Sequence, residues 1–117
     1  MKAIGGEYEE MACDYLESKG FRIVERGYIS PMGEIDIIAV MGDFICFVEV
    51  KGRGENSLYS PLEAVTHSKQ KKIIKTAVSY IKKNGIALQP RFDVVAIDSD
   101  KNIEHIENAF GSRRYYI

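Results

Sequence analysis

Three charged residues interrupt two apolar segments of the chain, and their types suit phosphate chemistry. Asp36 lies in the first segment, and Glu49 and Lys51 lie in the second. Between the segments, Gly42 and Asp43 predict a two-residue hairpin loop of type II′, with glycine at its first position. That turn sets Asp36 directly opposite Glu49, with Cβ atoms roughly 5 Å apart. Because strand side chains alternate, Lys51 points to the same side as Glu49.

A divalent cation would relieve the repulsion between two carboxylates held this close together. Mg²⁺ binds one or two carboxylates, keeps several waters and accepts phosphate oxygens. Lys51 would then orient or deprotonate the attacking water, or neutralise charge that develops on the phosphate. The alternative is a solvated ion pair between Glu49 and Lys51. A register slip of one residue would also put Asp36 and Glu49 on opposite faces of the hairpin.

The surrounding sequence predicts the elements that must position these residues. Apolar spacing and stop signals indicate helices over residues 7–19 and 61–83, and strands over residues 21–24, 35–40, 44–51 and 91–97. A polar loop is expected over residues 52–61, and residues 103–106 form at most a short edge strand. Asp93, on the last long strand, is expected to be structural. The order α-β-β-β-α-β predicts the α/β class, with a mixed β-sheet flanked by helices.

Length and composition favour one folded domain spanning residues 1–117. Hydrophobic residues are 45% of the chain and charged residues 28%, which argues against disorder. No apolar run approaches the roughly 20 residues of a membrane helix, and no secretory signal is recognisable. Cys13 and Cys46 show neither a disulfide framework nor zinc spacing. We therefore expect a reduced cytoplasmic protein, without a membrane partner, that packs both cysteines in its core.

The net charge of −1 conceals an uneven distribution of charge. Residues 51–91 contain nine basic and two acidic residues, whereas the rest of the chain contains seven basic and fifteen acidic residues. Net charge therefore does not indicate a nucleic-acid partner, but one basic element on a polarised molecule can hold a phosphate backbone. The alternative is that the lysine-rich helix is a solvated surface.

Longer motifs surround the three charged residues. Residues 33–39 read GEIDIIA and residues 47–53 read FVEVKGR, and residues 8–12, 63–65, 69–70 and 91–95 extend the pattern. Over about residues 5 to 110 the chain resembles the YraN family, small and mostly uncharacterised bacterial proteins related in fold to archaeal Holliday-junction resolvases. The Asp…Glu-x-Lys set resembles the core of the PD-(D/E)XK nuclease superfamily. The resemblance implies a restriction-endonuclease-like fold, in agreement with the predicted element order.

When the family's functional residues are matched to positions of this sequence, the resemblance implies four catalytic residues: Glu9, Asp36, Glu49 and Lys51. Asp36 and Glu49 would bind Mg²⁺ or Mn²⁺, with the carbonyl oxygen of Val50 as a further ligand. Lys51 would be the catalytic lysine.

Glu9 and Glu34 are the other acids with a predicted place near this site. Glu9 matches a helix glutamate that lies beside the metal site in the resolvases, and apolar residues three, four and seven positions later put it on an inward face. The residue before it is Tyr8, where the family usually has glycine. Glu34 is either a group that supports the metal site or a partner for Lys51 at the end of the hairpin.

Four residues are the predicted nucleic-acid contacts. Lys69 matches a lysine of the family's second helix, and Gln70 follows it. Lys72 and Arg53 would hold flanking phosphates on the helix and on the loop after residue 51.

Two functions follow from the resemblance together with the residues. The first is a metal-dependent endonuclease that hydrolyses phosphodiester bonds in DNA, with structured or branched DNA as substrate. The second is a non-catalytic nucleic-acid-binding module that retains the nuclease fold. A homodimer is expected by analogy, because a branched duplex offers two symmetric strands to one small domain with one site.

Overall fold

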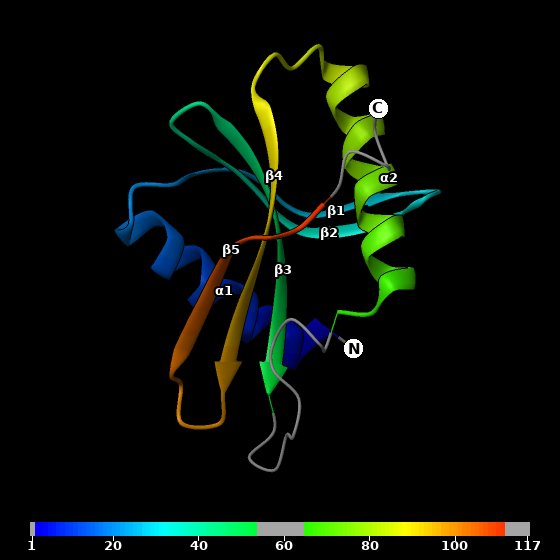
Figure 1. Ribbon diagram of the computed structural model, residues 1–117. Helices are drawn as coiled ribbons and strands as arrows, with labels where there is room; N and C mark the ends of the chain where they lie inside the picture. Colours follow the sequence, from blue (N-terminus) through cyan, green and yellow to red (C-terminus); the bar gives the residue numbers. More distant parts are fainter. Residues whose placement is uncertain (1, 54–64, 112–117) are drawn as a thin grey trace.

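The computed structural model describes residues 2–53 and 65–111 of the chain (Figure 1). Its elements follow the order α-β-β-β-α-β-β: α1 (Lys2–Ser18), β1 (Arg22–Ser30), β2 (Gly33–Met41), β3 (Phe44–Arg53), α2 (His67–Asn84), β4 (Gln89–Asp98) and β5 (Ile103–Phe110). The predicted α/β class with a mixed sheet and flanking helices is confirmed. Its organisation is consistent with a restriction-endonuclease-like fold.

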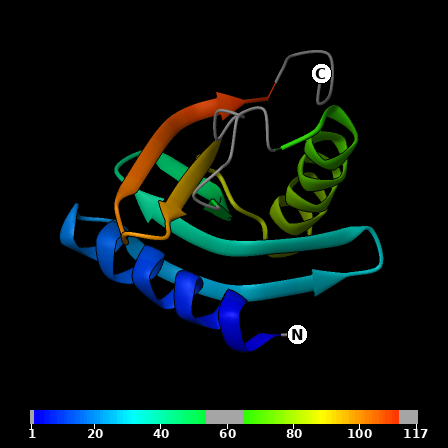
Figure 2. The ribbon, with the colours of Figure 1, turned by 90° about the horizontal axis from the view of Figure 1, so that it is seen from below.

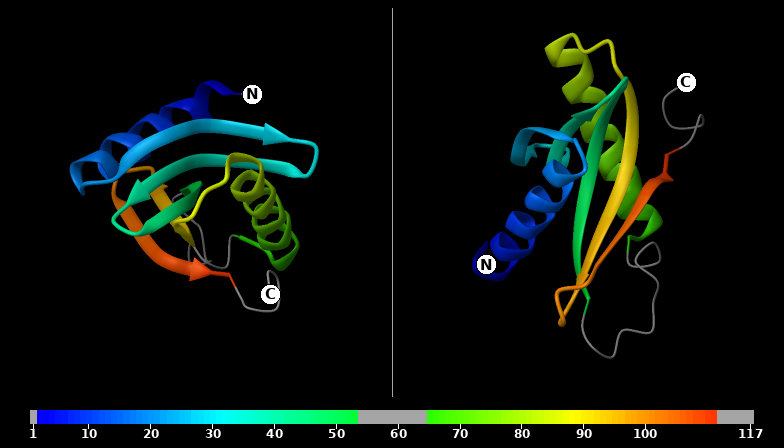
Figure 3. Two further views of the ribbon diagram at one scale, coloured as in Figure 1. Left: turned by 90° about the horizontal axis from the view of Figure 1, so that it is seen from above. Right: turned by 90° about the vertical axis from the view of Figure 1, so that its left-hand side faces the viewer.

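The five strands form one sheet in the order β1-β2-β3-β4-β5. Neighbouring strands are antiparallel except β3 and β4, which are parallel and are joined through α2. The two helices lie on opposite faces of the sheet (Figure 3). Each face has its own core, so the central strand β3 is covered on both sides, as its near-continuous apolar sequence requires. Neither helix of the described ranges is long and apolar enough to span a membrane.

The β2–β3 hairpin has the register that its turn predicts. Met41 pairs with Phe44, and the ladder continues to the pair of Ile37 and Val48. Gly42 has a φ of 57°, in the left-handed region that the first position of a type II′ turn requires. The predicted register is therefore confirmed over these five pairs.

Helix α2 begins later than the sequence suggests. Thr66 caps it, and its side chain accepts a hydrogen bond from the backbone N–H of Lys69. The sequence predicted a helix from residue 61. Residues 65 and 66 are not helical, so the prediction is wrong there, and residues 61–64 lie outside the described residues. A Thr at the N-cap satisfies one of the helix's unpaired N–H groups, which fixes the boundary. The helix ends at Asn84 as predicted, and Gly85 adopts the left-handed conformation with a φ of 60°.

The two outer strands are longer than their sequences predict. β1 continues to Ser30, beyond the strand predicted over residues 21–24, and forms a long curved hairpin with β2, whose turn lies beside α2 (Figure 2). β5 runs to Phe110 and is the fifth strand of the sheet. β1 is mostly exposed and β5 is mostly half-buried, and both lack the clean alternation of apolar and polar residues by which a strand with one buried face is recognised.

Candidate metal and nucleic-acid site

The site begins where β2 separates from β3. If the register continued, Val50 would exchange backbone hydrogen bonds with Ile35, but the pairing of β2 with β3 ends at Ile37 and Val48. The N–H of Val50 instead donates to Oδ2 of Asp36, at 2.8 Å. The carboxylate of Asp36 thus takes the place of a backbone carbonyl, and this holds Asp36 against β3.

Asp36 and Glu49 meet as the sequence predicts. The side chain of Glu49 is buried, with a relative exposure of 4%, and its carboxyl group shares a hydrogen bond with that of Asp36. Burial, and then the charge of Asp36, raise the pKa of Glu49 to about 7. Burial also raises the pKa of Asp36, against the hydrogen bond from Val50. Two carboxyl groups buried this close together repel each other when both are ionised, so a cation is a favourable occupant of the space between them.

Lys69 supplies a positive charge to this pair from the first turn of α2. Its Nζ lies 2.8 Å from Oε2 of Glu49. Burial lowers the pKa of Lys69, but its hydrogen bond and charge interaction with Glu49 outweigh that effect and raise it. The sequence predicted Lys69 as a nucleic-acid contact, and the structure brings it to the carboxylate of Glu49.

Lys51 and Val50 complete the set on β3. Lys51 is half-buried, and its charge lowers the pKa of Glu49, so the ammonium group is a near neighbour of that carboxylate. The N–H and C=O of one strand residue point to the same edge. The carbonyl of Val50 therefore faces the side on which Asp36 lies.

These groups fit a hard divalent cation. Asp36, Glu49 and the Val50 carbonyl offer oxygen donors only, which suits Mg²⁺ or Mn²⁺ with water in the remaining positions. Within residues 2–53 and 65–111, three or more His, Cys, Asp or Glu side chains do not gather into a metal-binding group. The donor set is therefore two carboxylates and a carbonyl, and it leaves room for water and for a phosphate oxygen.

The raised pKa of Glu49 predicts a pH-dependent cost of folding. The unfolded carboxyl group ionises near pH 4.5 and the folded one near pH 7, so ionisation opposes folding and stability falls as pH rises between these values. In EDTA, the free energy of unfolding of the Glu49→Gln variant, relative to that of wild type, should therefore rise by roughly 3 kcal/mol from pH 4 to pH 8.5. Urea unfolding of both proteins at the two pH values measures this difference. Glu17→Gln, an exposed change of the same kind, is the control, and a pH-independent Glu49→Gln difference would contradict the prediction.

Glu9 lies on α1, against the other face of the sheet from α2. It is half-buried, and its charge acts on Cys13 and on Arg26. The same turn of α1 reaches the end of β3, because a Cβ on Gly52 would lie 2.5 Å from the ring of Tyr8. Tyr8 thus fills the space beside Gly52. The role of Glu9 in the metal site stays a prediction.

The predicted nucleic-acid contacts lie at the start of α2 and at the end of β3. Lys72 is exposed one turn after Lys69. Gln70 instead donates from Nε2 to the carbonyl oxygen of Val65, at 2.9 Å, and so fixes the segment that leads into α2. Arg53 is the last residue of β3, and its side chain lies outside the described part of the structure.

A hollow of about 330 Å³ lies at the start of α2, and Glu34 and Lys69, the ion-pair partner of Glu49, both line it. Glu34 pairs with Ile29 of β1, and its charge raises the pKa of Asp36. The backbone pairing of β2 with β3 ends at Ile37 and Val48, so it does not extend to Glu34 and Lys51. The charge of Glu34 thus acts on Asp36, and both predicted roles of Glu34 stay predictions.

The sequence did not reveal a buried polar network around Asp93, although it predicted that residue as structural. Asp93 is fully buried and accepts two hydrogen bonds from Arg91, at 3.0 and 2.9 Å, and one from the N–H of Asn108. Nε2 of His105 lies 2.8 Å from its Oδ2, and Nδ1 of His105 lies 3.1 Å from the hydroxyl of Tyr15. This network ties β4 and β5 to α1. No spacing in the sequence links residues so far apart.

Both cysteines are free and buried, as predicted. Burial raises the pKa of Cys46 to about 11 and also raises that of Cys13. Both thiols are therefore protonated at neutral pH and pack as small apolar groups.

Comparison with known proteins places the chain among relatives of similar length. The profile described as "Uncharacterised protein family UPF0102" matches residues 8–97. A UPF0102 protein of Thermodesulfovibrio yellowstonii is 48% identical over 107 residues, covering 92% of this chain and 95% of that protein. UPF0102 proteins of Clostridioides difficile and Vibrio campbellii are 49% and 42% identical, covering 87% and 92% of this chain and 91% and 92% of their own lengths.

Proposed function

The chain belongs to the uncharacterised protein family UPF0102, and we propose that it is a metal-dependent endonuclease that hydrolyses phosphodiester bonds in DNA. The observation that supports this most is the buried pair of Asp36 and Glu49 with Lys51 and Lys69 around it. A sheet selected for stability alone would not hold two carboxyl groups this close without a cation. Structured or branched DNA is the substrate class that the resemblance to resolvases suggests.

Each group of the site has a role in this proposal. Asp36, Glu49 and the Val50 carbonyl would hold Mg²⁺ or Mn²⁺, which supplies Lewis-acid polarisation of the phosphate when bound. Lys51 would orient the attacking water in line with the leaving 3′ oxygen and stabilise the negative charge of the transition state. Lys69 and Lys72, at the start of α2, would bind the phosphates that flank the cleaved bond.

Cleavage assays test the proposal directly. Four-way, flapped and linear DNA are incubated with wild-type protein in Mg²⁺, in Mn²⁺ and in EDTA. Strand cleavage is expected with either metal and none in EDTA, and Glu49→Ala should remove it. Cleavage that persists in Glu49→Ala would mean that the activity comes from another site or from a contaminant.

A non-catalytic nucleic-acid-binding module is the second candidate. The ion pair between Lys69 and Glu49 supports it, because an ammonium group already neutralises the buried carboxylate without a metal ion. This candidate predicts DNA binding that neither metal nor Glu49→Ala changes, with no cleavage of any substrate. The assays above therefore separate the two functions.

If the site binds a metal ion, Lys69 competes with that ion for Glu49. In the Lys69→Met variant, which keeps the length of the side chain, Mn²⁺ affinity should rise about tenfold, since a nearby positive charge is lost. Isothermal titration with Mn²⁺ at pH 8.5, where Glu49 is ionised, measures the change. Lys72→Met removes an equal charge one turn further along α2 and should change the affinity by less than about threefold. An unchanged or weaker affinity in Lys69→Met would show that the two cations do not compete.

Two further features belong to the same proposal. We place the protein in the cytoplasm, where its two free thiols stay reduced. A homodimer would present two sites to a branched duplex, and the outer strand β1 carries exposed Val24 and Ile29 that suit such a contact. Sedimentation equilibrium measures the mass in solution.

A further inference from the structure

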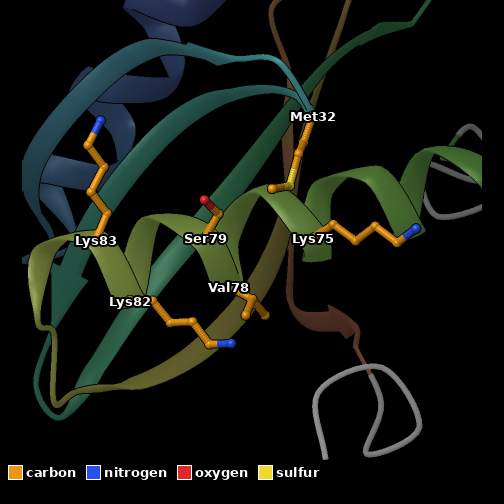
Figure 4. A pocket seen from close by; sticks show the side chains of 6 residues that line it. All are labelled: Met32, Lys75, Val78, Ser79, Lys82 and Lys83. Atoms are coloured by element: carbon orange, nitrogen blue, oxygen red, sulfur yellow. The ribbon is translucent and has the colours of Figure 1, made fainter.

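An open groove runs along the outer surface of α2, beyond the site. It has a volume of about 630 Å³ and is lined by one residue of the β1–β2 turn and five of the helix: Met32, Lys75, Val78, Ser79, Lys82 and Lys83. Figure 4 shows Met32 reaching over α2 from the turn, while Lys75, Lys82 and Lys83 project from the helix. Among the residues that the structure describes, the lining of the groove has three positive charges and no acid.

This groove continues the positive charge of the site. The smaller hollow at the start of α2 is lined by Lys69 and Lys72, by one acid, Glu34, and by Gly33, which directly follows Met32 in the sequence. The two hollows are thus neighbours on either side of the turn, and lysines line both. α2 carries six lysines and no acid.

The row of lysines has the length of a short piece of duplex. Lys69 and Lys83 are 14 positions apart, which at 1.5 Å per residue is about 21 Å along the helix axis. With one base pair every 3.4 Å or so, this distance corresponds to about six base pairs. A duplex arm that meets the site at Lys69 would therefore run past Lys75 and reach Lys82 and Lys83.

Met32 gives the groove an apolar wall. Its side chain is 50% exposed, although it lies against α2. A thioether beside lysines suits the mixed surface of a nucleic-acid backbone, which alternates charged phosphates with less polar sugar rings. An acidic protein would satisfy the lysines equally well, but it would not explain why the row begins at carboxylates that themselves fit a metal ion.

We infer that the groove between the β1–β2 turn and α2 binds the phosphate backbone of one duplex arm of the DNA substrate, about six base pairs long, beyond the cleaved bond. The inference rests on the proposed endonuclease function and extends it. It assigns phosphate contacts to Lys75, Lys82 and Lys83, which lie away from the carboxylates.

The test compares DNA binding by two charge-matched double variants. Lys75→Gln with Lys82→Gln removes two charges from the groove, and Lys19→Gln with Lys101→Gln removes two exposed charges elsewhere. Anisotropy of a fluorescein-labelled four-way junction in EDTA, from 50 to 300 mM salt, gives the affinity and its salt dependence. The groove variant should bind roughly tenfold or more weakly than wild type at 0.1 M salt, and its salt slope should fall by about 2. The control variant should match wild type within about twofold.

The outcomes separate this inference from the proposed function. If wild type binds with the expected salt dependence and the groove variant alone is weakened, the groove is supported even when wild type cleaves no DNA. If wild type cleaves DNA with Mn²⁺ but the groove variant binds like the control, the endonuclease stands and the groove assignment is overturned. Absence of salt-dependent binding by wild type would overturn it as well.

Discussion

Lys51→Met is expected to lower the rate of DNA cleavage by about 10² to 10³-fold while leaving DNA binding within about threefold of wild type. Methionine keeps the length of the side chain and removes only its charge and its donors. Lys51 lies near enough to Glu49 to lower the pKa of that carboxylate, so it can reach a phosphate held at the same place. Its contribution is therefore expected in the transition state, where negative charge on the phosphate is greatest.

The measurement for Lys51 is single-turnover cleavage of a labelled junction in Mn²⁺, together with anisotropy in EDTA. Lys71→Met serves as the control, because Lys71 is an exposed lysine of α2 that lines neither hollow. A Lys51→Met variant that binds DNA normally and still cleaves within about fivefold of wild type would exclude a catalytic role for Lys51.

Asp93→Ala is expected to give the largest loss of stability, about 3–5 kcal/mol. The substitution leaves Arg91, whose side chain is only 11% exposed, without its buried carboxylate partner and with only the exposed Glu107 near its charge. It also removes the acceptor of the Asn108 N–H and the partner of His105. Urea unfolding measures the loss. Glu107→Ala removes a carboxylate 3.9 Å from Arg91 that is 62% exposed and should cost under about 1 kcal/mol. Equal losses for the two variants would show that the buried network contributes little.

The pH dependence of the Asp93 network has the opposite sign from that of Glu49. Burial alone would raise the pKa of Asp93, but hydrogen bonds from His105 and Arg91 hold it below its usual value. Its stabilising contribution is therefore present above about pH 4, where the unfolded carboxyl group is ionised, and is lost as pH falls through the lower folded value. The difference between wild type and Asp93→Ala should shrink below pH 4.

The arrangement of the carboxylates was predictable because it depends on one local rule. A two-residue turn at Gly42 fixes the register of the hairpin, and the register then brings Asp36 toward Glu49. The central elements were predictable for a similar reason, since β3 and β4 are apolar along most of their length.

The features that escaped prediction depend on contacts between distant residues. The hydrogen bond from Val50 to Asp36 replaces a ladder bond, and nothing in the hairpin sequence signals that the strands separate there. The ion pair of Lys69 with Glu49 joins residues 20 positions apart and requires α2 to begin at His67, which depends on the cap at Thr66. The outer strands β1 and β5 were underestimated because both lack a clean alternation of apolar and polar residues.

The hydrogen bond between Val50 and Asp36 makes a main-chain amide in the middle of the protein sensitive to the site. Most amides of a central strand donate to a neighbouring carbonyl, whose charge is fixed. The amide of Val50 donates to a carboxylate, whose electron density changes when it gains a proton or coordinates an ion. Its nitrogen and proton resonances would therefore act as a built-in spectroscopic indicator of occupancy, without any label near the reacting groups.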